Sequence, residues 1–265
     1  MRAWPCPKLT DTVCDVLAQR RYDRILDAVR SDGPIEVRAL AELLNVSEAT
    51  VRRDLNRMQR SGLIKRVRGG AALGTATEPS YAQVASRDHV DKDAIAAAAA
   101  DLVHEGDVVL LDIGTTVHGL AARLHGRSVT VVTSSLAVYD ELANDEAVEL
   151  ILLGGAVRRN YRSLVGFLTE QALRQIHAQR LFLGTSGVRP DGTVLDTTTV
   201  EVPLKQAMLR AVDEVVLLAD PSKFPGSGLA RVCGPEDIDV LVCRAPAGDP
   251  TVAVFDDIGA RIVRA

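Results

Sequence analysis

The sequence predicts an α/β protein of two domains, in which a small helical domain precedes a larger domain with a mainly parallel sheet. At 265 residues the chain is long enough for this division. Its charge is uneven, because residues 1–70 carry 14 Lys and Arg against 9 Asp and Glu, whereas the remaining residues carry 17 against 26. Apolar residues first recur with helical spacing, and from residue 108 strand-like apolar runs alternate with helical patterns. Such alternation is typical of βαβ units around a parallel sheet.

The domain boundaries follow from these changes along the chain. The stretch after Gly70 is small and polar enough to be a linker, and the residues before the first helical pattern match nothing downstream. We therefore expect an N-terminal extension at residues 1–18, the small domain at 19–70, a linker at 71–90, the large α/β domain at 91–250 and a C-terminal segment at 251–265.

Composition argues against several classes of protein. The four cysteines form neither the CxxC pairs of a zinc site nor a disulfide scaffold, which favours reduced thiols in a reducing compartment. No apolar run approaches the roughly 18–20 residues that span a bilayer, and the N-terminus lacks the pattern of a secretory signal. We therefore expect a cytoplasmic protein with no membrane partner.

The small domain has the pattern of a helix-turn-helix. A first helix begins near Arg21, a second carries an apolar stripe from Val37 to Leu44, and a third begins after the candidate N-cap Ser47. The short turn at Asn45-Val46 joins the last two. In a helix-turn-helix the second of its two helices enters the major groove of DNA.

The third helix is rich in arginine on the side opposite its apolar stripe, and a basic, β-prone segment follows it as a candidate wing. Arginine can bind guanine edges or phosphates, although such a charged face is also an ordinary solvated surface. Asp54 could hold the guanidinium of Arg53 or Arg57, or form a simple surface ion pair. The candidate DNA-binding residues are Ser47, Ala49, Thr50, Arg52, Arg53, Asn56, Arg57 and Arg60 on the helix, with Lys65, Arg66 and Arg68 on the wing.

The large domain carries six expected strands and five expected helices. We place the strands at residues 108–111, 129–132, 150–153, 180–183, 215–218 and 240–243. Helical patterns lie at residues 93–103, 117–124, 136–142, 168–176 and 202–211.

Glycine and hydroxyl residues follow several of these strands. Ligands of open parallel sheets bind at the carboxyl ends of the strands, where backbone amides and hydroxyl groups favour an anion. A Gly-Thr-Thr turn also occurs as a plain helix N-cap, and a lysine after a strand is often only solvated. The candidate ligand residues on these loops are Asp112, Gly114, Thr115, Thr116, Thr133, Ser134, Ser135, Gly154, Gly155, Ser186, Gly187 and Lys223.

Two long stretches carry a family resemblance. Residues 46–55 (VSEATVRRDL) and 62–71 (GLIKRVRGGA) closely resemble the DeoR family of bacterial regulators. The strand-end loops, with Glu201 and Lys205, resemble the C-terminal effector domain of that family, so the likeness extends from about Arg21 to Cys243. It implies a winged helix-turn-helix followed by a sensor domain similar in fold to sugar-phosphate isomerases, with Lys205 among the effector-binding residues. Ser134 stands where the family usually has asparagine, which shortens the reach of that side chain.

The resemblance also implies a function. It implies a repressor of carbohydrate-metabolism genes that binds operator DNA and is released by a phosphorylated sugar or related metabolite. Because two half-sites one helical turn apart multiply affinity and specificity, we expect the protein to bind DNA as a homodimer or homotetramer. Glycine and hydroxyl loops at successive strand ends argue against a purely structural nucleic-acid-binding protein, which needs no ligand site.

The competing hypothesis is a sugar-phosphate isomerase-like enzyme with an accessory DNA-binding domain. Glu201 and Lys205 could act as an acid/base pair, but their i, i+4 spacing is also that of an ordinary helix ion pair. The histidines show no HxxxH or HxH spacing and no carboxylate cluster beside them. We therefore expect no catalytic residues, no metal and no cofactor.

Overall fold

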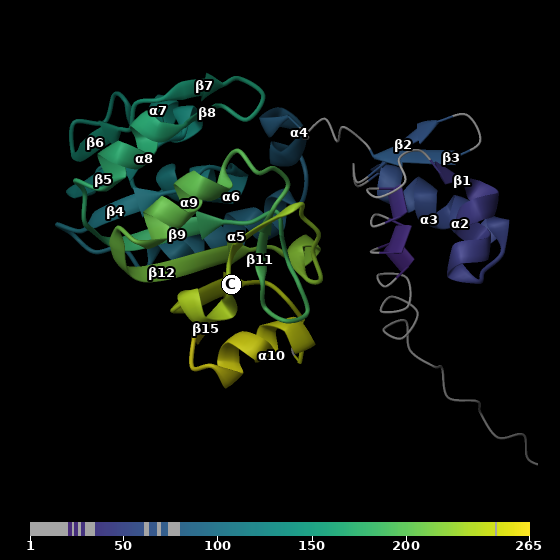
Figure 1. Ribbon diagram of the computed structural model, residues 1–265. Coiled ribbons are helices and arrows are strands. Elements are labelled where there is room, and N and C mark those ends of the chain that lie inside the picture. The colour runs from purple at the N-terminus through teal and green to yellow at the C-terminus, as the bar shows by residue number, and fades with distance from the viewer. Residues whose placement is uncertain are drawn as a thin grey trace, which may run out of the picture. The chain divides into compact units, whose positions relative to one another are not determined.

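The computed structural model describes residues 21–265, apart from residues 23, 26–27, 30–34, 61–63, 68–69, 74–79 and 247 (Figure 1). Of Arg60 and of residues 65–67 and 71–73 it describes only the backbone. The chain divides into two compact units, Met1–Pro79 and Ser80–Ala265. The expected extension at residues 1–18 lies outside the described residues.

The N-terminal unit is a small helical core with a short antiparallel sheet. Its first helix includes residues 21–22, 24–25 and 28–29. The elements that follow are β1 (Ile35–Glu36), α2 (Val37–Leu44), α3 (Glu48–Arg60), β2 (Ile64–Val67) and β3 (Gly70–Leu73). Apolar residues at helical spacing pack together from all three helices, among them Ile25, Leu40 and Leu55, which have no exposed surface. Leu43, expected on the apolar stripe of α2, is 46% exposed.

The wing is a hairpin of β2 and β3, and β1 pairs with the outer side of β3. Gly70 allows that pairing, since a Cβ at this position would lie 2.1 Å from the carbonyl oxygen of Ile35. The basic segment predicted from the sequence is thus one strand of a three-stranded sheet.

The C-terminal unit is built on a seven-stranded sheet in the order β15-β14-β12-β9-β4-β5-β6, in which every neighbouring pair is parallel. Its elements are α4 (Tyr81–Ala85), α5 (His89–Ala100), β4 (Val108–Leu111), α6 (Thr115–Ala121), β5 (Val129–Thr133), α7 (Leu136–Leu142), β6 (Val148–Leu152), β7 (Ala156–Arg158), β8 (Ser163–Val165), α8 (Phe167–Leu173), β9 (Ala178–Gly184), β10 (Gly187–Val188), β11 (Val194–Asp196), α9 (Val202–Leu209), β12 (Val212–Ala219), η1 (Pro221–Lys223), β13 (Ala230–Cys233), η2 (Pro235–Asp237), β14 (Val240–Cys243), α10 (Pro250–Asp257) and β15 (Arg261–Arg264).

Helices cover both faces of this sheet (Figure 1). Successive strand residues point to opposite faces, so Leu110 packs with α8, α9 and α10 while its neighbours Val109 and Leu111 pack with α5, α6 and α7. Because both faces are buried, the central strands are continuously apolar, which made them visible in the sequence. The predicted fold class, a helix-turn-helix unit with a mainly parallel α/β unit, is confirmed.

Two expected boundaries differ from the structure. The stretch 71–90 was expected to be a linker, yet it contains most of β3, the whole of α4 and the first two residues of α5. Residues 251–265 were expected to be a separate C-terminal segment, but they form most of α10 and the edge strand β15, which pairs with β14. α4, α10 and β15 are short, with five, eight and four residues, so periodicity alone did not reveal them. No helix among the described residues is long and apolar enough to cross a membrane.

Candidate nucleic-acid interface and ligand site

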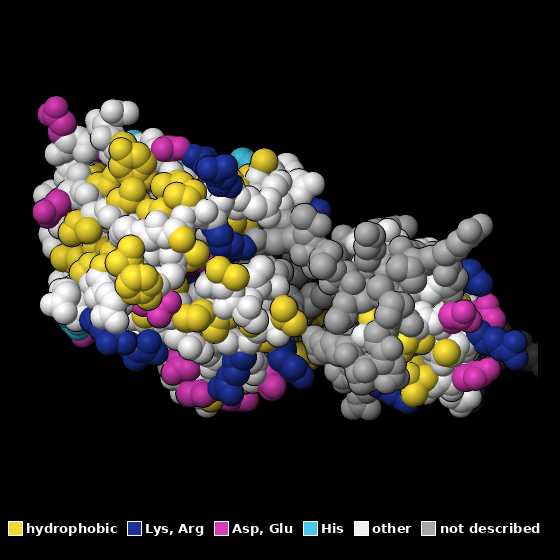
Figure 2. All heavy atoms as spheres, turned by 45° about the horizontal axis from the view of Figure 1, so that its top comes forward, with side chains coloured by type: hydrophobic (Ala, Val, Ile, Leu, Met, Phe, Trp, Pro, Cys, Tyr) yellow, Lys and Arg dark blue, Asp and Glu magenta, His cyan; other side chains and the backbone are white. Residues whose placement is uncertain are grey.

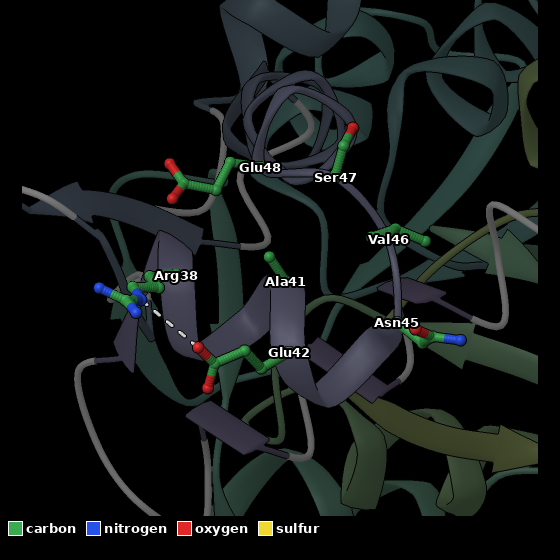
Figure 3. Close-up of a pocket in the computed structure, with 7 residues that line it drawn as sticks. All are labelled: Arg38, Ala41, Glu42, Asn45, Val46, Ser47 and Glu48. Atoms are coloured by element: carbon green, nitrogen blue, oxygen red, sulfur yellow. Dashed lines mark hydrogen bonds and ion pairs between the residues drawn. The ribbon is translucent and has the colours of Figure 1, made fainter.

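The turn between α2 and α3 is short and closed by local hydrogen bonds. α2 ends at Asn45, whose φ of 54° is left-handed, and the Val46 amide donates to the Ala41 carbonyl oxygen at 3.1 Å. Ser47 caps α3, because its Oγ accepts from the Thr50 amide at 3.2 Å. Figure 3 shows the turn and the start of α3 beside a shallow groove that also borders Arg38 and Glu42 of α2.

α3 buries one side and exposes the other. Its buried residues include Val51, Leu55 and Met58. Among the candidate DNA-binding residues of α3 and its cap whose side chains are described, Thr50 is half-buried and the others are exposed. The exposed ones are Ser47, Ala49, Arg52, Arg53, Asn56 and Arg57. The exposed face of α3 therefore holds three described arginines.

The arginines of α3 differ in their partners. Arg52 donates from Nη2 to Glu48 Oε2 at 3.1 Å, and both side chains are about half exposed. Such an exposed i, i+4 pair is weak, contributing about 0.3–0.5 kcal/mol. Arg53 has no hydrogen bond or ion pair within the described part of the chain, which leaves its guanidinium available to an external anion.

The other candidate DNA contacts are only partly described. Arg60 ends α3, and Lys65 and Arg66 lie on β2, but the structure describes none of these side chains. Arg68 lies outside the described residues.

Asp54 has a structural role that the sequence analysis did not foresee. It is 2% exposed, and its carboxylate accepts from Arg21 Nε at 2.7 Å and Nη2 at 3.2 Å. This bidentate pair fixes the first helix to α3. Both earlier interpretations, an orienting contact to Arg53 or Arg57 and a surface ion pair, are wrong, because helical spacing cannot identify a partner in another helix.

In the C-terminal unit, the parallel order of β12, β9, β4, β5 and β6 places their carboxyl ends along one edge of the sheet. The polar residues that follow these strands, together with the residues bonded to them, are called here the carboxyl-edge cluster. It includes Asp112 after β4, Ser134 after β5 and Asp220 after β12. It also includes Asp196 at the end of β11, Thr198 after that strand, Glu201 directly before α9 and Lys205 in α9.

Lys205 lies at the centre of this cluster and is 3% exposed. Its Nζ donates to Asp112 Oδ2 at 2.7 Å and to the Gly184 carbonyl oxygen at 2.9 Å, and lies 3.3 Å from Asp196 Oδ2. Burial alone would lower the pKa of Lys205, but the two carboxylates outweigh burial and hold that pKa above its usual value. The ammonium group is hydrogen-bonded to Asp112 and Gly184 and ion-paired with Asp196, so Lys205 holds two carboxylates in place.

Glu201 forms a second buried group beside Lys205. Its Oε1 accepts from Ser163 Oγ at 2.7 Å and pairs with Arg158, while Oε2 is buried with no hydrogen-bond partner. Burial raises the pKa of Glu201. The Glu201–Lys205 helix ion pair considered from the sequence is not formed, since each side chain has partners from other elements.

The loop after β5 combines two structural hydroxyl groups with one unpartnered group. Thr133 Oγ1 donates to the Leu111 carbonyl oxygen at 2.8 Å, tying β5 to β4. Ser135 caps α7, because its Oγ accepts from the Val138 amide. Ser134 Oγ is buried and has no partner. Ser134, the residue that departs from the family pattern, is thus the one whose hydroxyl remains available.

The glycines of the predicted ligand loops have different roles. Gly114 precedes α6 with φ 119°, and a Cβ there would meet no atom within 4 Å, so this backbone faces open space next to Thr115 and Thr116. A Cβ on Gly155 would lie 2.2 Å from Thr169 Oγ1, which itself donates to the Gly154 carbonyl oxygen at 2.7 Å. Gly154 and Gly155 therefore pack the chain against α8.

Three further predicted ligand residues lie on the loops after β9 and β12. Ser186 Oγ accepts from the Thr197 amide at 3.1 Å, and Gly187 packs against the backbone of Gly226. Lys223 is half-buried, and its Nζ lies 3.9 Å from Asp220 Oδ2. Unlike Lys205, Lys223 is partly accessible to a ligand.

Unpartnered buried atoms gather on the carboxyl-edge cluster. Within the described residues, side-chain atoms of this kind are Ser134 Oγ, Thr198 Oγ1, Glu201 Oε2, Asp220 Oδ2 and the Tyr81 hydroxyl. A buried polar atom without a partner costs about 1–3 kcal/mol, so a group of them calls for an explanation such as a ligand. Thr198, Glu201 and Asp220 were not among the predicted site residues. Asp220 follows β12 as Asp112 follows β4, and that repeated position was the signal available for it.

The described residues hold no group of three or more His, Cys, Asp or Glu side chains arranged to bind a metal ion.

Comparison with protein families gives two matches that together cover most of the chain. Residues 21–77 match the DeoR-like helix-turn-helix domain, and residues 87–244 match the DeoR C terminal sensor domain. Solved structures with partial likeness include a ribose 5-phosphate isomerase A from Methanocaldococcus jannaschii. The match has 18% sequence identity and a TM-score of 0.37, and it covers 50% of this chain and 52% of that chain. Another is eIF2B beta from Chaetomium thermophilum. This match has 17% sequence identity and a TM-score of 0.43, and it covers 85% of this chain and 63% of that chain.

Curated relatives align over nearly their whole length. The HTH-type transcriptional regulator GolR of Listeria innocua is 32% identical over 90% of this chain and 95% of that protein. The HTH-type transcriptional repressor GlcR of Bacillus subtilis is 31% identical, over 84% of this chain and 87% of that protein. The lactose phosphotransferase system repressor of Staphylococcus epidermidis is also 31% identical, over 84% of this chain and 90% of that protein. These relatives are regulators, which confirms the prediction of a regulator rather than an enzyme, and this chain belongs to the DeoR family of DNA-binding transcriptional regulators.

Proposed function

We propose that the protein is a repressor of carbohydrate-metabolism genes, which binds operator DNA through α3 and the wing and leaves it when a phosphorylated sugar or related metabolite binds the carboxyl-edge cluster. The observation that carries the proposal is the presence in one chain of an exposed arginine face on a capped helix and of a buried cluster with unpartnered polar atoms. The names of the relatives, which include a lactose phosphotransferase system repressor, support the carbohydrate assignment. As a regulator of chromosomal genes it would act in the cytoplasm.

The chemistry of the cluster supports a ligand with both hydroxyl and anionic groups. Glu201 Oε2 and Asp220 Oδ2 can accept hydrogen bonds from sugar hydroxyl groups, and Ser134 Oγ can donate or accept one. The open backbone at Gly114, the hydroxyl groups of Thr115 and Thr116, and the partly accessible ammonium group of Lys223 are suited to a phosphate. Asp112, Asp196 and Lys205 would hold these groups in position.

Fluorescence anisotropy tests the proposal directly. The purified full chain is titrated onto labelled DNA from upstream of its own coding sequence and onto an unrelated duplex, with salt as a variable. The titration is repeated with glucose 6-phosphate, fructose 1-phosphate, fructose 6-phosphate, tagatose 6-phosphate, ribose 5-phosphate and inorganic phosphate.

We expect the upstream DNA to bind about 10³-fold or more tightly than the unrelated duplex, with affinity falling as salt rises. One sugar phosphate should weaken that binding while inorganic phosphate has less effect. Equal affinity for both duplexes, or turnover of a sugar phosphate, would refute the proposal and favour the isomerase-like enzyme.

We also propose a homo-oligomer, a dimer or a tetramer, because helix-turn-helix proteins bind pairs of half-sites about one helical turn apart. Exposed hydrophobic side chains on β6, β7 and α8 are candidates for the contact between copies: Ile151, Val157, Phe167 and Leu168, at 38%, 57%, 71% and 57% exposure. β6 is also an edge strand of the sheet. Figure 2 shows hydrophobic side chains gathered on one face of the C-terminal unit.

Sedimentation velocity checks the assembly. The wild-type chain should sediment as a dimer or tetramer, and the double variant Phe167→Glu with Leu168→Glu should shift toward the monomer, because two charges would be buried in the contact. Ile258→Glu, at a 48% exposed position after α10, is the matched control and should leave the assembly unchanged. A monomeric wild-type chain, with and without DNA, would contradict the oligomer.

A further inference from the structure

α4 is the first element of the C-terminal unit, and residues 74–79 connect it covalently to the wing. It begins with a capping box, in which Gln83 N donates to Ser80 Oγ at 3.4 Å and Ser80 N donates to Gln83 Oε1 at 3.0 Å. The box fixes where the connecting segment ends and the C-terminal unit begins. α4 is therefore the part of the C-terminal unit that lies nearest to the wing along the chain.

Tyr81, the first residue of α4, rests on the turn between β7 and β8. It is 8% exposed, and its amide donates to the Asn160 carbonyl oxygen at 3.0 Å. Its ring meets the Tyr161 ring edge-on, with centroids 6.0 Å apart, and the Arg162 guanidinium lies 5.9 Å from the Tyr81 centroid. Tyr81 is thus fixed to three consecutive residues of one hairpin.

The same hairpin supplies side chains to the carboxyl-edge cluster. Arg158, at the end of β7, stacks on Tyr161 at 5.8 Å and pairs with Glu201. Ser163, at the start of β8, donates to the same Glu201 carboxylate at 2.7 Å. A ligand that engages the free Oε2 of Glu201 therefore acts on the hairpin against which Tyr81 packs.

Tyr81 also contacts a second element of the proposed ligand site. Its ring meets that of His118 on α6, with centroids 6.3 Å apart. α6 begins at Thr115, directly after the open backbone of Gly114. Tyr81 therefore contacts both the hairpin that bonds to Glu201 and the helix that follows Gly114, without being part of the proposed ligand site.

The other end of α4 is held by a buried lysine of α5. Lys92 is 7% exposed, and its Nζ donates to the carbonyl oxygens of Val84 at 2.6 Å and Arg87 at 2.7 Å. Burial lowers the pKa of Lys92, while the charges of Asp220 and Lys223 also act on it. One carbonyl group of α4 and one of the turn that follows it are thus bonded to the Lys92 ammonium group of α5.

We propose that α4 is the element that couples ligand binding at the carboxyl-edge cluster to DNA binding, and that Tyr81 is the positioning residue that carries this coupling. The inference rests on the proposed function, since it concerns the regulation of the same site. A ligand can shift DNA affinity only if it binds two arrangements of the protein unequally. Packing of Tyr81 on β7–β8 and α6 ties α4 to the arrangement that the ligand selects.

Three variants of the full chain separate coupling from folding and from binding. Tyr81→Ala removes the ring contacts, Tyr81→Phe keeps them and removes only an unpartnered hydroxyl group, and Ile258→Ala is a control at an exposed position away from α4. For each, operator Kd is measured by anisotropy alone and with the sugar phosphates named above. The coupling factor is the ratio of the two Kd values.

The wild-type chain, Tyr81→Phe and Ile258→Ala should show equal coupling factors, within the usual range of about 5–150-fold. Tyr81→Ala should bind the operator as the wild type does but lose most of its coupling, reaching a factor of about 1–2. Full coupling in Tyr81→Ala overturns the inference and leaves the proposed function intact. A wild-type chain that no sugar phosphate releases from DNA refutes the proposed function, and the inference with it.

Hydrogen exchange on the wild-type chain gives a second readout that does not depend on a variant. The sugar phosphate that weakens operator binding should change amide exchange in residues 81–86 as well as in the loops after β4 and β5. A change confined to the loops, with residues 81–86 unaffected, would contradict a role for α4 in coupling.

Discussion

Replacing Lys205 with methionine is expected to reduce the free energy of unfolding by about 3–5 kcal/mol, because it removes one member of a buried ion-pair group and leaves its partners uncompensated. Asp112 and Asp196 are 1% and 5% exposed and lie within 3.3 Å of the ammonium group. Methionine is apolar and of similar length, so the loss comes from charge rather than from a cavity. Urea unfolding of the full chain, followed by circular dichroism, measures it.

The loss should depend on pH in a definite direction. Burial raises the pKa of Asp112 even with Lys205 present, so removing the ammonium group raises it further. A carboxyl whose folded-state pKa lies above its unfolded value stabilises the fold at low pH and loses that contribution as pH rises. The deficit of Lys205→Met should therefore be largest at neutral pH and shrink as pH falls toward the carboxyl range.

Lys223→Met is the matched control for this prediction. Lys223 has 20% side-chain exposure, and its Nζ lies 3.9 Å from Asp220 Oδ2, which is beyond hydrogen-bond distance, so its removal should cost less than that of Lys205. Equal stability of the two methionine variants would contradict the description of Lys205 as the centre of a buried ionic group.

Replacing Arg53 with alanine is expected to weaken operator binding by about 1–3 kcal/mol. Arg53 is exposed on α3 and has no partner among the described residues, so the free protein loses no internal contact. Anisotropy titrations at several salt concentrations measure this loss of operator affinity and show whether Arg53 contacts a phosphate or a base edge. If Arg53 binds a phosphate, the salt slope should fall by about one. If it binds a base edge, the slope should change less and specificity should relax at one position.

Arg38→Ala removes the same charge from the same unit and serves as its control. Arg38 is on α2, is 80% exposed and forms a weak pair with Glu42 at 3.4 Å. Its loss should weaken binding less, because in a helix-turn-helix the second helix, here α3, is the one that enters the major groove. If both variants lose the same operator affinity, Arg53 acts only through its charge, and the expected contact of α3 with the major groove is contradicted.

The sequence was sufficient for the elements that have strong periodicity. Ser47 as the cap of α3, the inward stripe of Val51, Leu55 and Met58, and the six strands of the parallel sheet from β14 to β6 were predicted correctly, because local caps and burial on both sheet faces leave clear patterns. The edge strand β15 and the short strands outside this sheet, apart from β2 of the wing, were not predicted. The cap of α4 had an equally local signal, the Ser80-x-x-Gln83 capping box, which was overlooked in a polar stretch.

Side-chain partners could not be predicted in the same way. Asp54 pairs with Arg21, which is 33 positions away, and Lys205 pairs with Asp112, which is 93 positions away. Spacing rules describe neighbours on one helix, so they suggested Glu201 for Lys205 and Arg57 for Asp54. For the same reason the sequence located the Thr133-Ser134-Ser135 loop but could not show that only the middle hydroxyl group remains unpartnered.

The central claim is that one chain links a ligand site to a DNA site, and reciprocity tests it most directly. Isothermal titration calorimetry measures the Kd of the releasing sugar phosphate for the free protein and for the protein saturated with operator. Linkage requires operator to weaken ligand binding by the same factor by which ligand weakens operator binding. Equal factors, within the usual range of about 5–150-fold, are the expected result. A ligand Kd that operator leaves unchanged would contradict the account, even if both partners bind.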